Sequence, residues 1–300
     1  MRAAGVMLCL ILAGCGGGKQ KSGRTLDASI EKLIPPDTVV LGGVSVQPVL
    51  KSPLYARLLA EQKEPEQLRE FERATGLDLK RDLSEVYFAS NGKSGLMFAR
   101  AAIKDQAALE QALESKGASR IVSGRYNLFG NQAQAVVFLE GKLAVAGPVD
   151  LLKAALAGET GDTAKKQAVL YHLGSIPPDV HAWAVSVGGF APMPLPQTGN
   201  LANLNRIFAS LESATMTLDL SDGANLAAAG TCTDEKTAKQ LHDTLRGLIG
   251  FGRLSTPADK PEMLRLFDGI EVAIAGARVN VNAVVPMDMV DYFLKQSPRR

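Results

Sequence analysis

Cysteine and histidine have the widest chemical repertoire of the side chains here, and the sequence holds three of each: Cys9, Cys15, Cys232, His172, His181 and His242. A zinc site needs three or four ligands, and neither His-Glu-x-x-His nor Cys-x-x-Cys spacing occurs. We therefore expect no metal or other cofactor. His181 and Trp183 would share one face of a strand, which makes them a weak candidate for an aromatic-lined binding site.

Serine-based catalysis has no recognisable motif either. The segment closest to Gly-x-Ser-x-Gly runs from Gly43 to Gln47 and lacks the final glycine that a nucleophile elbow requires. Charged residues cluster between Glu61 and Arg73, where helical spacing predicts a solvated face rather than a pair of catalytic carboxylates. The sequence thus favours a non-catalytic protein, and an enzyme with an unrecognised site is the weaker alternative.

The start of the chain has the composition of an export signal. Arg2 is followed by an uncharged apolar stretch of roughly ten residues, then by the small residues Ala13 and Gly14, and then by Cys15. A membrane-spanning helix needs about 20 apolar residues, twice this length. We expect residues 1–14 to be a cleaved signal peptide and the glycine-rich residues 15–25 to be a flexible tether.

Leu12, Ala13, Gly14 and Cys15 resemble, in this order, the lipobox of bacterial lipoproteins. The resemblance implies a diacylglycerol joined to Cys15 by a thioether and cleavage between Gly14 and Cys15. It also implies a further acyl chain on the new amino group, and two or more chains hold a protein stably in a bilayer. Gly16, in place of Asp, implies the outer membrane, facing the periplasm, rather than the inner membrane. The alternative is an ordinary secretory signal with an incidental cysteine.

Composition restricts the remaining possibilities. The formal net charge is +2, and no stripe of Lys and Arg with interleaved aromatic residues occurs, so we do not expect a nucleic-acid partner. Cys232 would be the one cysteine left in the body, which rules out an intramolecular disulfide there. With 46% hydrophobic residues in 300, the chain can form one large core or two modest ones.

The body contains signs of a duplication. The phrase Ile-Pro-Pro-Asp occurs at 34–37 and again at 176–179, and an apolar strand is expected after each copy, at Thr38–Val46 and Val180–Val187. We therefore expect a first repeat at 26–160 and a second at 161–300.

Further elements follow in both repeats. In the first, we expect helical segments over Pro48–Thr75, helices beginning at Asp105 and Pro148, and strands Glu85–Ser90, Gly95–Ala102, Ser119–Val122, Tyr126–Phe129, Gln134–Leu139 and Leu143–Ala146. In the second, we expect helices over Leu201–Leu211 and from Asp234 and Pro286, and strands Thr215–Leu220, Leu226–Thr231, Glu271–Ala275 and Arg278–Val285.

Several strands alternate apolar and polar residues, which is typical of antiparallel sheets with one covered face. The predicted fold is α+β: two pseudo-repeats of mainly antiparallel sheet with helices packed mostly on one face. The body resembles uncharacterised repeat-containing envelope lipoproteins.

The function that these observations favour is that of a lipid-anchored, exported, non-catalytic binding or assembly module. Its acyl chains on Cys15 would contact the membrane, and its partner would be an unknown envelope protein or a lipophilic ligand. The alternative is a carrier or sensor of a lipophilic ligand, with strand residues such as Val39, Leu41, Val44 and Val46 lining a cavity.

Overall fold

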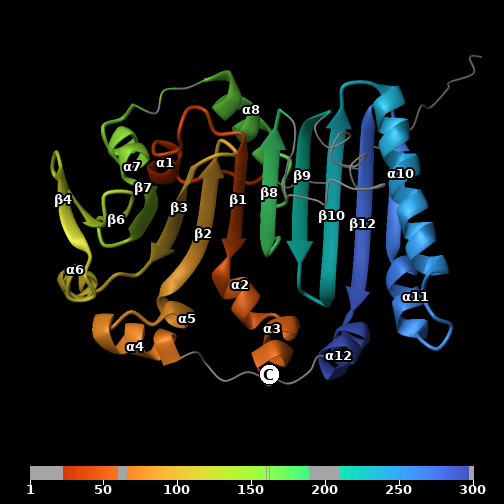
Figure 1. The fold of residues 1–300 in the computed structure, drawn as a ribbon, viewed down its shortest axis with the longest axis horizontal. Helices are drawn as coiled ribbons and strands as arrows, with labels where there is room; N and C mark the ends of the chain where they lie inside the picture. Colours follow the sequence, from red (N-terminus) through yellow and green to blue (C-terminus); the bar gives the residue numbers. More distant parts are fainter. Residues whose placement is uncertain (1–22, 60–65, 160, 162, 189–209, 297–300) are drawn as a thin grey trace, which may run out of the picture.

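The computed structural model describes residues 23–59, 66–159, 161, 163–188 and 210–296 (Figure 1). Gly14, Cys15 and most of the helix expected at Leu201–Leu211 lie outside these residues. Leu211 itself begins a strand.

One antiparallel sheet of twelve strands runs through both halves of the described chain, in the order β11-β12-β10-β9-β8-β1-β2-β3-β7-β6-β5-β4. The two halves of the chain meet near its centre, at the antiparallel pair of β1 (Val40–Ser45) and β8 (Ala182–Val187). The others are β2 (Leu83–Ser90), β3 (Gly95–Ala101), β4 (Ser119–Ser123), β5 (Tyr126–Gly130), β6 (Gln134–Leu139), β7 (Leu143–Pro148), β9 (Leu211–Asp219), β10 (Gly223–Cys232), β11 (Ile270–Ala275) and β12 (Arg278–Pro286).

Each half of the sheet follows the same path outward from this centre. The meanders β1-β2-β3 and β8-β9-β10 are each followed by a helix, α6 (Gln106–Ser115) or α10 (Glu235–Leu254). The chain then returns from the outer edge, so that β7 pairs with β3 and β12 pairs with β10. A duplication would produce this strand order. The duplication itself remains a prediction, but the two halves share one sheet.

The other helices are short and lie around the sheet (Figure 1). They are α1 (Ala28–Glu31), α2 (Val46–Lys51), α3 (Pro53–Leu59), α4 (Glu66–Thr75), α5 (Leu79–Asp82), α7 (Val149–Leu156), α8 (Ala164–Leu173), α11 (Pro261–Asp268) and α12 (Met287–Gln296). Two expected helix starts are confirmed, because Asp105 and Asp234 accept hydrogen bonds from the backbone N–H groups of Ala108 and Thr237. The described residues of the range Pro48–Thr75 belong to α2, α3 and α4, apart from Ser52, which is extended between α2 and α3, and residues 60–65 lie outside the described part of the chain.

The two faces of the sheet differ. We call the face that carries Val40 and Val44 the front face, and the face that carries Leu41 the back face. In the first half, the back face forms the main core against α1, α7 and α8, with Phe98, Val145, Ile30, Leu152 and Leu173 among its members. In the second half, the back face carries polar strand residues such as Thr215, Thr217, Asn280 and Asn282, and α10 packs on the front face instead. The α+β class with a large antiparallel sheet is confirmed.

The strand expected at Thr38–Val46 is shorter than predicted. The strand residues are Val40–Ser45, and Val46 begins α2. Ser45 is both the last residue of β1 and the N-cap residue of α2, so the chain leaves the sheet there and α2 packs against β2.

Candidate functional site: an apolar pocket on the front face

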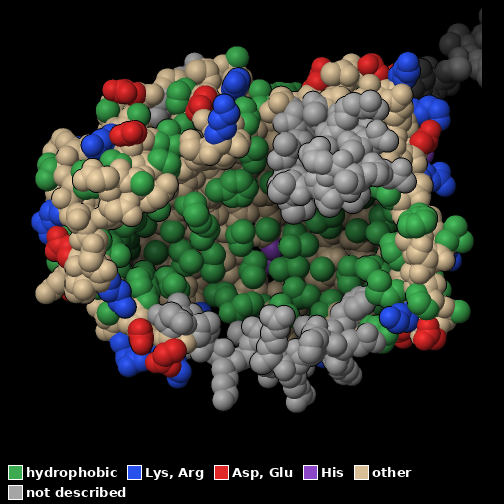
Figure 2. Space-filling view, viewed as in Figure 1, with side chains coloured by type: hydrophobic (Ala, Val, Ile, Leu, Met, Phe, Trp, Pro, Cys, Tyr) green, Lys and Arg blue, Asp and Glu red, His purple; other side chains and the backbone are tan. Residues whose placement is uncertain are grey.

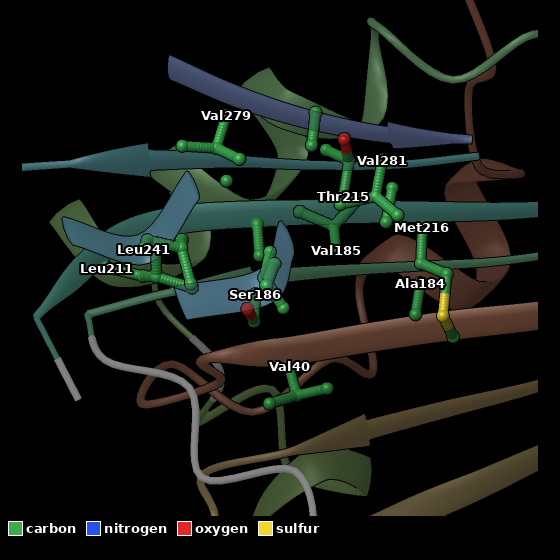
Figure 3. Close-up of a pocket in the computed structure, with 15 residues that line it drawn as sticks. Val40, Ala184, Val185, Ser186, Leu211, Thr215, Met216, Leu241, Val279 and Val281 are labelled. Atoms are coloured by element: carbon green, nitrogen blue, oxygen red, sulfur yellow. The ribbon is translucent and has the colours of Figure 1, made fainter. Parts of the chain in front are cut away.

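A pocket lies on the front face between the sheet and α10 (Figure 3). Its volume is about 140 Å³. The floor comes from β1, β8, β9, β10 and β12, and Leu241 and Leu245 of α10 form one wall. The residues that line it are Val40, Ala184, Val185, Ser186, Leu211, Ala214, Thr215, Met216, Ala228, Ala229, Gly230, Leu241, Leu245, Val279 and Val281.

Small residues on neighbouring strands account for the hollow. Ala228 lies opposite Met216, and Gly230 lies opposite Ala214, on adjacent strands with side chains on the same face. Ala184 of β8 continues this row on the other side of Met216. Alanine has only a methyl group and glycine has no side chain, so these positions do not reach α10. Space is therefore left between the helix and the sheet.

The lining is almost entirely apolar. Ser186 is its one lining residue with a hydroxyl group on the front face, because Thr215 lies on the back face, and none of its residues is ionisable. Such a site cannot supply a general acid, a general base or a set of metal ligands. An apolar cavity of comparable volume, about 150 Å³, stays dry and binds benzene-sized molecules. The pocket is therefore suited to an apolar group.

Apolar side chains extend beyond the pocket across the front face, and Figure 2 shows them gathered in a hollow between the rims of the molecule. Met216 lines the pocket and is 44% exposed. Farther along the sheet, Val44, Phe88 and Met97 are also exposed, Met97 to 58%. An apolar molecule longer than the pocket could therefore continue along the sheet.

His181 takes part in the structure of the sheet. It is buried, and its Nδ1 accepts a hydrogen bond from the backbone N–H of Leu220 at 3.1 Å. The same nitrogen lies 3.2 Å from Oδ1 of Asp219. These contacts attach the start of β8 to the end of β9.

Trp183 belongs to the back-face core rather than to the pocket. Its ring lies 6.2 Å from the ring of Tyr87, and the guanidinium of Arg24 lies 5.6 Å from its centroid. Neither Trp183 nor His181 lines the apolar pocket. A binding role for this pair stays a prediction.

The strand residues proposed to line a lipophilic cavity are not gathered around one space. Val39 and Leu41 pack in the back-face core, Val44 lies on the front face, and Val46 is in α2. Val40 is the residue of β1 that lines the pocket. Sequence reasoning missed the pocket, although the small-residue run from Leu226 to Gly230 was a signal for it.

The described residues contain no cluster of three or more His, Cys, Asp or Glu side chains that could hold a metal ion. Cys232 is buried, and burial raises the pKa of its thiol. None of the helices in the described part of the chain combines the length and apolar character needed to cross a bilayer.

Comparisons with known proteins identify a shared fold and no family. No family model matches the chain, and no curated protein matches it. Crystal form III of TP0453 aligns with a TM-score of 0.51 at 8% identity, over 88% of this chain and 96% of that chain. Crystal form I aligns with a TM-score of 0.49 at 8% identity, over 90% and 97%. The chain is thus similar in fold to TP0453 along most of its length.

Proposed function

We propose that this protein is an exported, lipid-anchored envelope protein that binds a lipophilic ligand on the front face of its sheet. The apolar pocket carries this proposal. The resemblance of residues 12–15 to a lipobox supports an anchor at Cys15, and Gly16 supports the outer membrane as its location, facing the periplasm. The ligand role is non-catalytic, because the pocket lining contains no ionisable side chain.

The proposed ligand has an acyl chain or an apolar ring. One end of the ligand enters the pocket beneath Leu241 and Leu245, and the rest lies along the exposed apolar side chains of β1, β2 and β3. Removing a methylene group from water contributes about 0.8 kcal/mol, so affinity should rise with chain length until the hollow is filled.

A pair of variants on one strand tests the proposal. Ala228→Phe places a ring in the pocket, whereas Ala227→Phe places the same ring on the exposed back face of β10. Binding of a fluorescent long-chain fatty acid would be measured for the wild type and both variants. We expect Ala228→Phe to weaken binding at least about tenfold, since the ring occupies the space of a similar-sized apolar group, and Ala227→Phe to leave it unchanged.

Circular dichroism would verify that both variants fold. Equal affinities in the two variants, or no fatty-acid binding by the wild type at solubility-limited concentrations, would contradict the proposal. Mass spectrometry of organic extracts from the purified protein gives a second measurement, in which co-purified lipid should be depleted by Ala228→Phe and retained by Ala227→Phe.

A further inference from the structure

β11 forms one outer edge of the sheet. It pairs with β12 on one side, and no described strand pairs with it on the other. The backbone groups on that outer side are therefore available to another chain. This edge lies at the far side of the second half from the centre of the sheet, next to α10 and α11.

The register identifies the outward backbone groups. The N–H of Val284 in β12 donates to the carbonyl of Gly269, the residue before β11, at 3.0 Å. These two residues are therefore a hydrogen-bonded pair of the ladder between β12 and β11. Hydrogen-bonded pairs recur at every second residue of an antiparallel ladder. Glu271 and Ala273 therefore bond to β12, and the N–H and C=O groups of Ile270, Val272 and Ile274 point away from it.

This edge carries one charged side chain, Glu271, but its sequence has none of the other features that usually protect sheet edges. The sequence Ile-Glu-Val-Ala-Ile-Ala contains no proline and no Lys or Arg, and its pairing with β12 has no bulge. The opposite edge strand, β4, is shorter and carries Arg120, which pairs with Glu114. The two edges are thus not equivalent.

A groove of about 600 Å³ runs beside β11. Ile270 and Val272 form its floor, and Ile249 and Gly250 of α10 with Phe267 of α11 form its apolar walls. An added strand would place every second side chain on the same face as Ile270 and Val272, which is the face that α10 and α11 cover. The groove could thus hold alternate apolar side chains of such a strand.

The charges of the groove indicate the partner's composition. Arg246 and Arg253 line the groove from α10, and Asp268 and Glu271 are its acidic residues, with Glu271 on the opposite face of β11 from Ile270 and Val272. Arg253 pairs with Asp268, whereas Arg246 is exposed and makes no ion pair within the described residues. An acidic side chain on the groove side of the added strand would pair with Arg246.

We propose that β11 binds an extended segment of a partner protein, which adds to the sheet as a further strand with alternating apolar residues and one acidic residue facing Arg246. This is recognition by strand addition, in which main-chain hydrogen bonds supply affinity and alternate pockets supply specificity. A second copy of this chain is a poorer occupant, because a two-fold axis at β11 would bring α10, α11 and Arg246 of both copies together. The inference is independent of the lipophilic pocket.

The probe for this site is the peptide Asp-Thr-Val-Thr-Ile-Thr-Val, added to the mature acylated protein in detergent micelles. Amide hydrogen exchange would be followed residue by residue. We expect the peptide to slow exchange at Ile270, Val272 and Ile274, whereas Glu271 and Ala273 should be protected with or without it. Unchanged exchange at the three outward amides at saturating peptide would overturn the proposal.

Two modifications that prevent the backbone hydrogen bonds make the test specific. The same peptide methylated at alternate backbone nitrogens cannot donate to β11 and should bind at least about tenfold more weakly. Val272→Pro removes one outward N–H and should also weaken binding, while Val272→Thr, which keeps that N–H but alters the groove floor, should weaken it less. Equal binding of the methylated peptide would overturn the proposal even if Val272→Pro fails to fold.

Charge reversal tests the orientation of the strand. Arg246→Glu should weaken binding of the acidic peptide and strengthen binding of a peptide with Lys in place of Asp. Sedimentation without peptide examines the competing occupant. A dimer that Val272→Pro dissociates would assign this edge to a second copy and overturn the partner-protein proposal, and a monomer supports it.

Discussion

Gly43 of β1 lies opposite Trp183 of β8, and its lack of a side chain leaves room for the indole ring. A Cβ atom on Gly43 would lie 2.8 Å from Cζ2 of Trp183 and 2.7 Å from Cδ1 of Tyr87. Both rings are buried. The central pair of strands, where the two halves of the sheet meet, therefore depends on a glycine at this position.

Alanine at Gly43 should destabilise the protein more than alanine at the adjacent Gly42. A Cβ on Gly42 would lie 2.2 Å from Cε1 of Phe88 and 3.1 Å from the backbone oxygen of Trp183, but Phe88 is 40% exposed and can turn toward solvent. Tyr87 and Trp183 have no such freedom. We expect Gly43→Ala to lower the free energy of unfolding by about 1–3 kcal/mol, in the range of core overpacking, and Gly42→Ala by less. Urea denaturation would measure both, and an equal loss would contradict the explanation.

Stability should decrease in acid because of Asp82. The Arg81 side chain donates two hydrogen bonds to its carboxylate and the N–H of Asp78 donates another, and the pKa of Asp82 is lowered to about 2. In the unfolded chain an Asp has a pKa of about 3.9. The ionised carboxylate therefore stabilises the fold above about pH 4, and this contribution is lost as the pH falls toward 2.

Asp82→Asn measures this contribution. The full shift corresponds to about 1.4 kcal/mol per pKa unit, and the exposure of Arg81 reduces it, so we expect on the order of 1–2 kcal/mol at pH 7. Denaturation of the variant should show a smaller decrease in stability between about pH 4 and pH 2. A variant with the wild-type pH dependence would show that other carboxyl groups determine it.

The thiol of Cys232 should be unreactive in the folded protein. Its side chain is buried, and burial raises the pKa of the thiol, so little thiolate is present and a reagent cannot reach it. Modification by a disulfide reagent at pH 8 should be at least about tenfold slower than in denaturing urea. Equally fast modification would place Cys232 on an accessible surface.

The anchor prediction has its own test. Cys15→Ser removes the acyl acceptor, so the precursor should keep residues 1–14 and lose metabolic labelling with palmitate. Gly16→Asp is a matched variant that keeps Cys15 and its acylation but should move the protein from outer-membrane to inner-membrane fractions. Labelling that persists in Cys15→Ser would contradict the lipobox interpretation.

Local patterns predicted the elements of this fold well. The strands predicted at Glu85–Ser90 and Gly95–Ala102 are joined by a turn at Asn91 and Gly92, with Gly92 at φ +88° and Asn91 Oδ1 accepting from two backbone N–H groups. Such features depend on neighbouring residues alone. The pairing of β1 with β8 does not, because 146 positions separate Val40 from Ser186 and no local pattern specifies which strands meet.

The pocket and the free edge could not be predicted from the sequence for a related reason. Ala184, Ala214 and Ala228 form a hollow only because three strands place them side by side beneath α10. Helix α11 was not predicted, and with α10 it forms the groove beside β11. The alternation of apolar and polar residues along Arg278–Val285 correctly separated the two faces of β12. It did not indicate how much of the apolar face the helices leave uncovered.

The pairing of β1 with β8 also affects the order of folding. During synthesis β1 emerges early, but its partner on one side is complete only when Val187 has been made. The β2–β3 and β9–β10 hairpins can form from local contacts, whereas the centre must wait for a contact between distant segments. The first half therefore exposes one side of β1 until the second half arrives, and newly made chains are most prone to aggregate during this interval.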